Sequence, residues 1–293
     1  MKTKLINKKI LFFFMNQDQL IKEILEDSTP SYLKIAHVFE LMNIADTTSI
    51  QTLHKVIESN PCELVRHEAI FALGEMAPER DTVEFLKKII KEDSSYVVQH
   101  EALIAIGTIG EKKDIEFLRE FENHPDFEIQ CSAKIGIQRL TQEPGFEDEI
   151  KNNLDHYKKH LFDYSNSNQN ERIQILFQLM LLGEKEIDTI KKCLHKDICR
   201  VVRHEAGFVL GEIGTLEAID AMASILNSEA TDIVIHETLF ALGTTGKQEA
   251  LEHIEPFINH TSYVISESAK IAIDRIKHLK NPYSGARHFN EEC

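Results

Sequence analysis

Apolar side chains recur along this chain at the spacing of amphipathic helices. In residues 81–92, apolar positions fall three or four residues apart, as on one face of a helix. The polar residues 93–95 then offer turn and N-cap chemistry before a second helix begins. No segment shows the alternating pattern of a strand. The sequence therefore predicts an all-α protein built from paired helices.

The helical pairs repeat. Segment 64–76 (LVRHEAIFALGEM) and segment 201–213 (VVRHEAGFVLGEI) share nine of thirteen residues. A second related pair is 97–110 (VVQHEALIAIGTIG) and 233–246 (IVIHETLFALGTTG), with the same order of apolar residues, His-Glu and glycine. Such self-similarity, with a period of two helices, is typical of α-solenoids, in which each unit buries its apolar face only by stacking on its neighbours.

Alignment on the histidine of these motifs defines a common frame position in eight repeats. The frame residues are Ile35, His67, His100 and Cys131 in the first half, and Ile173, His204, His236 and Glu267 in the second. Equivalent positions differ by 138, 137, 136 and 136, so the second half is an almost gapless copy of the first. We predict an α-solenoid of eight short HEAT-like hairpins in two halves related by a pseudo-twofold axis. The terminal repeats, which lack His-Glu, are expected to cap each stack.

Breaks in this period set the predicted boundaries. They are an N-terminal extension (1–17), a first repeat half (18–140), a partly helical connector (141–170), a second repeat half (171–280) and a tail (281–293). The apolar run 10–15 is too short for a secretory or membrane-spanning segment, which favours an extension or a start at Met15 instead of Met1.

Charge and cysteine content narrow the function. With 48 acidic and 33 basic residues, the net charge of -15 argues against gripping a nucleic-acid backbone and suits a cationic partner. The five cysteines are odd in number and scattered, which predicts neither a disulfide framework nor a thiolate zinc site. A reducing compartment is favoured, and we expect a cytoplasmic protein.

Four His-Glu pairs occupy one structural position in the two middle repeats of each half. They are His67-Glu68, His100-Glu101, His204-Glu205 and His236-Glu237. Buried imidazoles and carboxylates in this number are costly unless they bind a cation or one another. Because these ligands suit iron, manganese or zinc and are too many for one ion, the pattern predicts a two-metal site, with a structural His-Glu hydrogen-bond network as the alternative.

The remaining chemistry-bearing residues are predicted to be structural. Ten histidines fall outside the frame and are expected at the surface or in packing. They are His37, His54, His124, His156, His160, His195, His253, His260, His278 and His288. The frame glycines Gly74, Gly107, Gly211 and Gly243 are expected to terminate helices or to permit close helix packing.

The motifs RHEAIFALG (66–74) and RHEAGFVLG (203–211), in a set of four His-Glu pairs, resemble deoxyhypusine hydroxylase from about Asp18 to about Leu279. The resemblance implies a non-haem di-iron monooxygenase with two Fe²⁺ ions per chain and O₂ as co-substrate. It further implies hydroxylation of the deoxyhypusine side chain on the hypusine-containing translation factor, without a direct nucleic-acid or membrane partner.

Alternatives remain open at this point. A HEAT-like scaffold or bilin-lyase-like protein would bind a partner or chromophore without redox metal, and a di-metal hydrolase would turn over without oxygen. Metal content and oxygen dependence distinguish the three. The sequence itself does not separate iron from manganese.

Twofold symmetry makes the glutamates equivalent in pairs, Glu68 with Glu205 and Glu101 with Glu237. If the halves face each other with reversed order, the metal groups are His67 with His236 and Glu237, and His100 with Glu101 and His204. The family resemblance implies Glu101 and Glu237 as the carboxylate ligands. We therefore expect Glu68 and Glu205 to contact the substrate amines, although all eight residues are candidate ligands.

Overall fold

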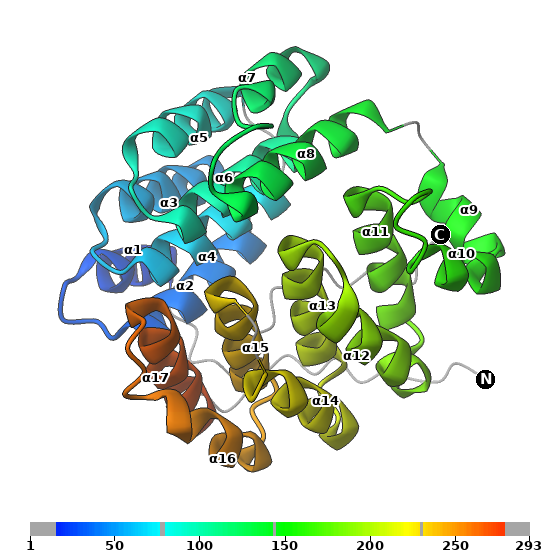
Figure 1. Ribbon diagram of the computed structural model, residues 1–293. Helices are drawn as coiled ribbons and strands as arrows, with labels where there is room; N and C mark the ends of the chain where they lie inside the picture. Colours follow the sequence, from blue (N-terminus) through cyan, green and yellow to red (C-terminus); the bar gives the residue numbers. More distant parts are fainter. Residues whose placement is uncertain (1–15, 77–79, 143–144, 229–230, 279–293) are drawn as a thin grey trace, which may run out of the picture.

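The computed structural model describes residues 16–76, 80–142, 145–228 and 231–278. Within these ranges the chain forms helices and no strand, which confirms the all-α prediction. Figure 1 shows the helices in two groups, an inner group that faces the centre of the molecule and an outer group that covers it. The predicted boundary residues 1–15 and 279–293, including Met15, lie outside the described ranges.

Eight inner helices carry the frame positions, one in each repeat. They are Ser31–Ile44 (α2), Glu63–Glu75 (α4), Tyr96–Ile109 (α6), Phe127–Thr141 (α8), Gln169–Met180 (α11), Arg200–Ile213 (α13), Asp232–Thr244 (α15) and Tyr263–His278 (α17). Each is preceded by an outer element. These elements are Gln17–Leu25 (α1), Thr47–Ser59 (α3), Arg80–Glu92 (α5), Lys112–Asp114 (η1) with Ile115–Arg119 (α7), Phe146–Asn152 (α9) with Leu154–His160 (α10), Gly183–Glu186 (η2) with Ile187–Lys196 (α12), Leu216–Leu226 (α14), and Gln248–Ala250 (η3), Leu251–Ile254 (α16) and Glu255–Phe257 (η4).

Outer and inner helices differ in pattern because they differ in surroundings. Helix α5 buries Leu86 and Ile90 on one face and carries charged residues on the other. Helix α6 is buried almost all round, since it lies between the outer layer and the centre of the molecule. Caps fix where inner helices start: Asp126 accepts from the backbone N–H groups of α8, and Asn168 forms a capping box with Glu171 at α11.

The frame glycines permit close packing between successive inner helices. A Cβ at Gly107 would stand 2.4 Å from the Cα of Gly136, and one at Gly211 would stand 2.7 Å from the Cβ of Ala241. These glycines lie inside α6 and α13 and do not end them. For these two glycines, close packing is therefore the predicted role that the structure shows.

The two halves face each other in reversed order, as Figure 1 shows. Helix α2 of the first repeat contacts α17 of the eighth, and α8 of the fourth repeat contacts α11 and α13. The terminal repeats therefore do not end in solvent as caps, because each packs on the opposite half. Ring closure of this kind places the middle inner helices α4, α6, α13 and α15 around a shared interior.

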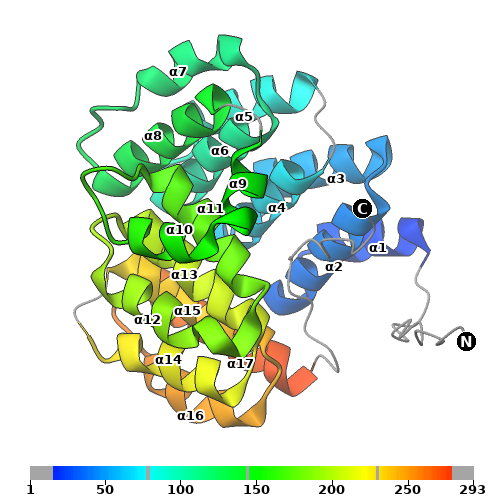
Figure 2. The ribbon, with the colours of Figure 1, turned by 90° about the vertical axis from the view of Figure 1, so that its right-hand side faces the viewer.

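The connector contributes an outer layer to the fifth repeat. Helices α9 and α10 contact α11, and Figure 2 shows them beside that helix.

Four cysteines, Cys62, Cys131, Cys193 and Cys199, are buried free thiols. None of the helices in the described ranges is long and apolar enough to cross a membrane.

Candidate metal centre

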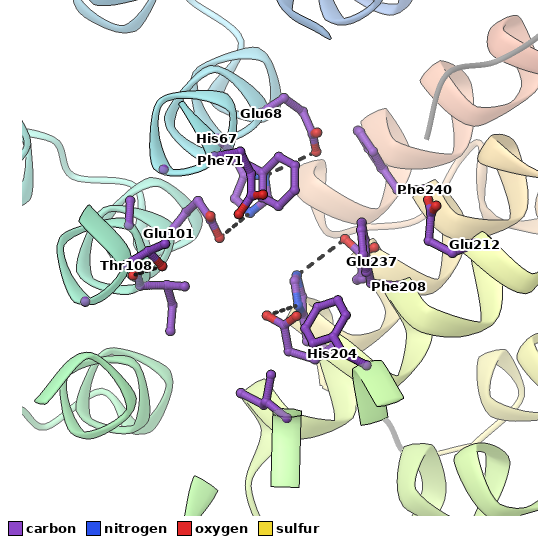
Figure 3. A pocket seen from close by; sticks show the side chains of 18 of the residues that line it. His67, Glu68, Phe71, Glu101, Thr108, His204, Phe208, Glu212, Glu237 and Phe240 are labelled. Atoms are coloured by element: carbon purple, nitrogen blue, oxygen red, sulfur yellow. Dashed lines mark hydrogen bonds and ion pairs between the residues drawn. The ribbon is translucent and has the colours of Figure 1, made fainter. Parts of the chain in front are cut away.

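The eight predicted site residues come together in the interior between the halves. His67, His100, His204 and His236 are all buried, with 0–4% of their surface exposed. Their glutamate neighbours are buried as well, apart from Glu205, which is partly buried. Figure 3 shows side chains of α4 and α6 approaching side chains of α13 and α15 across one cavity.

The four histidine rings form one cluster, in which His67 and His100 of the first half lie 5.5 Å apart between centroids. The ring centroids of His67 and His236 lie 5.3 Å apart, and those of His100 and His204 lie 5.2 Å apart. These are the two pairs expected when a second repeat lies opposite a third repeat. Two groups of ligand atoms, His67/His100/His204 and His204/His236/Glu237, also have all their members within 4.8 Å of one another. The cluster is thus compact enough for a pair of ions, and His204 is near both.

The four glutamates fall into two geometrically different pairs. Glu101 Oε2 lies 3.6 Å from Nε2 of His67, and Glu237 Oε2 lies 3.4 Å from Nε2 of His204. These carboxylates thus face the same ring nitrogens that point into the cluster. Glu68 and Glu205 instead lie beside the Nδ1 atoms of their own neighbours His67 and His204, at 3.3 and 3.7 Å.

Repeat stacking explains this division. A residue that follows the frame position reaches the frame residue of the preceding repeat, so Glu101 reaches His67 and Glu237 reaches His204. Glu68 and Glu205 belong to second repeats, and the frame residues of the first repeats are Ile35 and Ile173. They therefore have no histidine at the frame position of the preceding inner helix.

The unsatisfied nitrogens of the cluster fit a metal. Nε2 of all four histidines is buried without a hydrogen-bond partner. A buried polar atom without a partner costs free energy, and native structures rarely leave one. Four such lone-pair positions that converge with two carboxylates are the donor set of a divalent transition-metal site. The residues present therefore fit iron, and also manganese or zinc.

In the protein without metal, burial shifts the pKa values of two glutamates and two histidines of the cluster. Burial raises the pKa of Glu101 to about 7 and that of Glu237 well above its usual range. Burial and the neighbouring histidines hold the pKa values of His100 and His236 well below normal. Without a cation these four side chains thus favour their neutral forms, and a bound dication would reverse this for the two carboxylates. His67 differs, because Glu68 and the nearby carboxylates outweigh its burial and raise its pKa.

Glu205 behaves differently from Glu101. Although burial opposes it, the adjacent His204, together with the charges of Arg139 and His67, lowers the pKa of Glu205. Glu205 thus stays ionised near neutral pH. A permanently charged carboxylate beside a cavity is suited to binding a cationic group.

The cavity next to the histidines has a volume of about 360 Å³. The residues that line it recur at intervals of about one helical turn along the inner helices. One turn beyond the frame position stand phenylalanines, and Phe71 and Phe208 from opposite halves approach to 6.0 Å between centroids. The other members of this aromatic collar, on the same face of their helices, are Phe39, Phe177 and Phe240. The collar separates the polar floor of the cavity from its outer rim.

Two turns beyond the frame position, the rim is charged. It includes the equivalent pairs Glu75 with Glu212 and Arg139 with Arg275. Sequence reasoning missed the collar and the rim, although the signal was available. Residues four and eight positions beyond the frame histidine face the same side of an inner helix, and they match between the halves.

Comparison with known proteins agrees with the repeat architecture. A HEAT-repeat family profile matches residues 18–99 and 50–138, and a PBS lyase HEAT-like repeat profile matches residues 202–228. A structure of human deoxyhypusine hydroxylase in complex with glycerol superposes with a TM-score of 0.76 at 21% identity, covering 89% of this chain and 96% of that one. The chain contains HEAT repeats in its first half and shares the fold of human deoxyhypusine hydroxylase.

Further solved structures match with lower TM-scores. The complex of CpcE and CpcF of phycocyanin lyase from Nostoc gives a TM-score of 0.34 at 16% identity, over 94% of this chain and 98% of that one. An engineered protein gives a TM-score of 0.35 at 19% identity, over 89% and 78%. No curated protein matches this chain in a sequence comparison.

Proposed function

We propose that this protein is a non-haem di-iron monooxygenase that hydroxylates deoxyhypusine on the hypusine-containing translation factor. The observation that carries the proposal is the convergence of four buried, unpartnered Nε2 atoms with Glu101 and Glu237 at the floor of an open cavity. The shared fold of human deoxyhypusine hydroxylase supports the same activity. Because the proposed substrate is a translation factor, the proposal places the enzyme in the cytoplasm.

The ligand sets in this proposal draw on both halves. His67 with His236 and Glu237 would hold one iron, and His100 with Glu101 and His204 would hold the other. Two bound ferrous ions would supply the activation of O₂ that an aliphatic C–H bond requires. In the balanced reaction one oxygen atom enters the C–H bond and the other leaves as water, with two electrons and two protons from an external reductant.

The chain itself would bind and orient the substrate. Glu205, held ionised by His204 and Arg139, and its equivalent Glu68 lie at the cavity floor and would pair with the substrate amines. The collar phenylalanines Phe71 and Phe208 would pack against the alkyl segments between those amines and exclude water from the floor. A long, cationic, unbranched side chain suits this sequence of charged floor and apolar collar.

The test combines metal analysis with oxygen labelling. Protein purified without oxygen is loaded with ferrous iron, and the iron per chain is measured. It is then given the deoxyhypusine-bearing factor, an electron donor and ¹⁸O₂. We expect close to two irons per chain and one labelled oxygen atom in the product side chain.

Two variants control this experiment. His204→Ala should lose iron and activity, whereas His195→Ala should keep both, because His195 is partly buried and bonds Ser224 away from the site. A folded protein that retains no metal would support the scaffold alternative. Turnover that incorporates oxygen from water would support a hydrolase. Either result would contradict the proposal.

A further inference from the structure

Two buried serines contact the metal-centre histidines from the terminal repeats. The Oγ of Ser132 on α8 lies 3.3 Å from Nδ1 of His100, and the Oγ of Ser268 on α17 lies 2.9 Å from Nδ1 of His236. Both serines are completely buried. They occupy equivalent positions, each immediately after the frame residue of a fourth repeat.

The proton of each serine hydroxyl is already used. Ser132 donates to the backbone carbonyl of Glu128 at 2.8 Å, and Ser268 donates to that of Val264 at 2.6 Å. A hydroxyl has one proton to donate and two lone pairs that accept. Since that proton points at a carbonyl, the serine oxygen can only accept a hydrogen bond from the imidazole. Nδ1 of His100 and of His236 must therefore carry the N–H.

The opposite ring nitrogen is then fixed as well. In a neutral imidazole with its proton on Nδ1, Nε2 presents a lone pair. Nε2 of His100 and Nε2 of His236 are the buried, unpartnered atoms that point into the cluster. The serines would thus set both the tautomer and the ring orientation that a metal ligand requires.

From this geometry we infer that Ser132 and Ser268 are positioning residues that hold His100 and His236 in the Nδ1–H tautomer, with Nε2 free to bind metal. The inference rests on the proposed metal-binding function. It gives the terminal repeats a role, because each of these repeats lacks His-Glu and instead supplies the hydrogen-bond acceptor for the histidine of the repeat before it.

Nδ1 of the other two histidines faces a carboxylate, and only His67 is close enough to form a hydrogen bond with it. His67 lies 3.3 Å from Glu68, and His204 lies 3.7 Å from Glu205. Serine therefore serves the third-repeat histidines, and a carboxylate stands beside the second-repeat histidines. This difference makes the serine effect specific, since a change at Ser132 should alter His100 and leave the tautomer of His67 unaltered.

The primary experiment measures the tautomers directly in the full-length protein without metal. Long-range ¹H–¹⁵N correlation spectra of ¹⁵N-histidine-labelled protein distinguish an Nδ1–H ring from an Nε2–H ring. We expect Nδ1–H for His100 and His236 in the unmodified chain. In Ser132→Ala the His100 signal should shift toward Nε2–H while the His236 signal stays, and Ser268→Ala should give the converse.

Metal affinity provides the second readout. Loss of such a hydrogen-bond partner typically weakens metal binding by about 10- to 100-fold. We expect a loss of this size for ferrous and cobaltous ions in Ser132→Ala and Ser268→Ala. Threonine at either position keeps the hydroxyl, can bond the same carbonyl, and should restore affinity in at least one of the two sites.

A matched control removes a buried hydroxyl that touches no histidine. Thr238 on α15 is completely buried and donates to the carbonyl of Val234 at 2.6 Å, the same bond that each serine makes. Thr238→Val should leave the tautomers of His100 and His236 unchanged. Its metal affinity should stay within about twofold of that of the unmodified chain.

Several outcomes would overturn the inference. One is an Nε2–H ring at His100 or His236 in the unmodified chain, and another is an unchanged tautomer together with unchanged metal affinity in both alanine variants. An equal loss of affinity in Thr238→Val would also reject it, since the effect would then be general destabilisation. Protein that shows the expected tautomers and binds iron but does not hydroxylate deoxyhypusine would contradict the proposed function and leave this inference supported.

Discussion

The two halves of the molecule meet at two seams that are built differently. At the α8–α11 seam, Gln138 donates to Gln169 at 2.8 Å and Arg139 donates to Asn170 at 3.2 Å. At the α17–α2 seam, the rings of Tyr32 and His278 stack with centroids 5.5 Å apart. The connector joins the halves only beside the first seam. Between these unlike seams the two halves present matching histidines and glutamates.

This contrast shows what duplication preserved. The inward faces of α4, α6, α13 and α15 remain equivalent because both halves contribute to one cluster. The seams could diverge, since one is held by the continuous chain and the other by noncovalent contacts alone. Differences between equivalent residues should therefore be small at the floor of the cavity and larger toward its rim and at the seams.

The largest expected effect is loss of iron. It tests whether equivalent glutamates of the two halves have the same role, and whether the two glutamates within each half have different roles. Alanine at Glu101 or at Glu237 should abolish iron retention to the same extent, because each carboxylate faces the Nε2 atoms of the cluster. Alanine at Glu205, and less completely at Glu68, should leave much of the iron bound and weaken substrate capture. Iron per chain and substrate affinity are the measurements. If Glu205→Ala loses iron as fully as His204→Ala does, all eight residues belong to the metal site.

A second prediction sharpens the difference at the rim. Arg275 is buried, and the charges of Glu68, Glu237 and Glu212 act on it, whereas its equivalent Arg139 is only partly buried. Arg275→Met should therefore destabilise the metal-free protein by about 3–5 kcal/mol, since it leaves the buried Glu68 without its neighbouring cation. Arg139→Met should cost less. Denaturant unfolding of both variants measures the difference, and equal costs would show that the rim is as symmetric as the floor.

Much of this organisation could be predicted from the sequence. The His-Glu frame and its near-constant offset predicted the helical hairpins and the convergence of the four histidines His67, His100, His204 and His236. Ring closure could not be predicted, because the contact of α17 with α2 depends on the small rotation accumulated over every repeat. Ser132 and Ser268 were missed since a lone serine after a frame residue has no chemical signature until its hydrogen-bond partner is known.

The roles of the four glutamates could be predicted only in part from the sequence. Helical geometry alone left open which pair faces the metal, and only the family resemblance favoured Glu101 and Glu237. The structure supplies a physical reason, namely that a residue after the frame position approaches the preceding repeat. The frame residues before Glu68 and Glu205 are Ile35 and Ile173, so only Glu101 and Glu237 face a histidine at the preceding frame position.

The third prediction uses metal removal to compare the seams. Iron at 100 times its dissociation constant should stabilise the protein by about 2.7 kcal/mol, since it binds the folded state through ligands from both halves. Without iron, amide hydrogen exchange should rise more in α2 and α17 than in α8 and α11, which the connector keeps together. Protease sensitivity of residues 141–170 should rise as well. Equal exchange and equal thermal stability with and without iron would contradict metal bridging of the halves.

The fourth prediction concerns pH and the equivalent acids. Burial raises the pKa of Glu101 to about 7, above that of the unfolded chain. The folded protein therefore binds the extra proton, and the resulting stability is lost as pH rises from about 4.5 through about 7. Compared with Glu101→Gln, the metal-free chain should lose roughly 1–3 kcal/mol between pH 5 and pH 8. Glu237→Gln should show the same sign, because burial also raises the pKa of Glu237.

The measurement is denaturant unfolding of the metal-free proteins at several pH values. The glutamine variants cancel the opposing effect of His100 and His236, whose lowered pKa values reduce stability toward acid in every protein compared. A stability difference between the metal-free chain and Glu101→Gln that does not change with pH would show that Glu101 is not held protonated in the folded state.

The smallest predicted difference lies in helix packing, at equivalent glycines of the two halves. A Cβ at Gly74 would meet the Cβ of Ala105 at 3.2 Å, whereas one at Gly211 would meet that of Ala241 at 2.7 Å. Gly211→Ala should thus cost about 1–3 kcal/mol through overpacking. At Gly74 a small shift of Ala105 relieves the contact, and the better helix propensity of alanine offsets part of the cost, by up to about 1 kcal/mol.

Gly207→Ala serves as the control on α13, since its Cβ would meet the nearest atom, Oγ1 of Thr238, at 3.4 Å, an ordinary contact. It should be neutral or stabilising. Thermal unfolding of the three variants ranks them, with Gly211→Ala lowest and Gly207→Ala highest. If Gly74→Ala proves as costly as Gly211→Ala, then α4–α6 and α13–α15 pack with equal tightness in solution, and the halves differ only at their seams and rim.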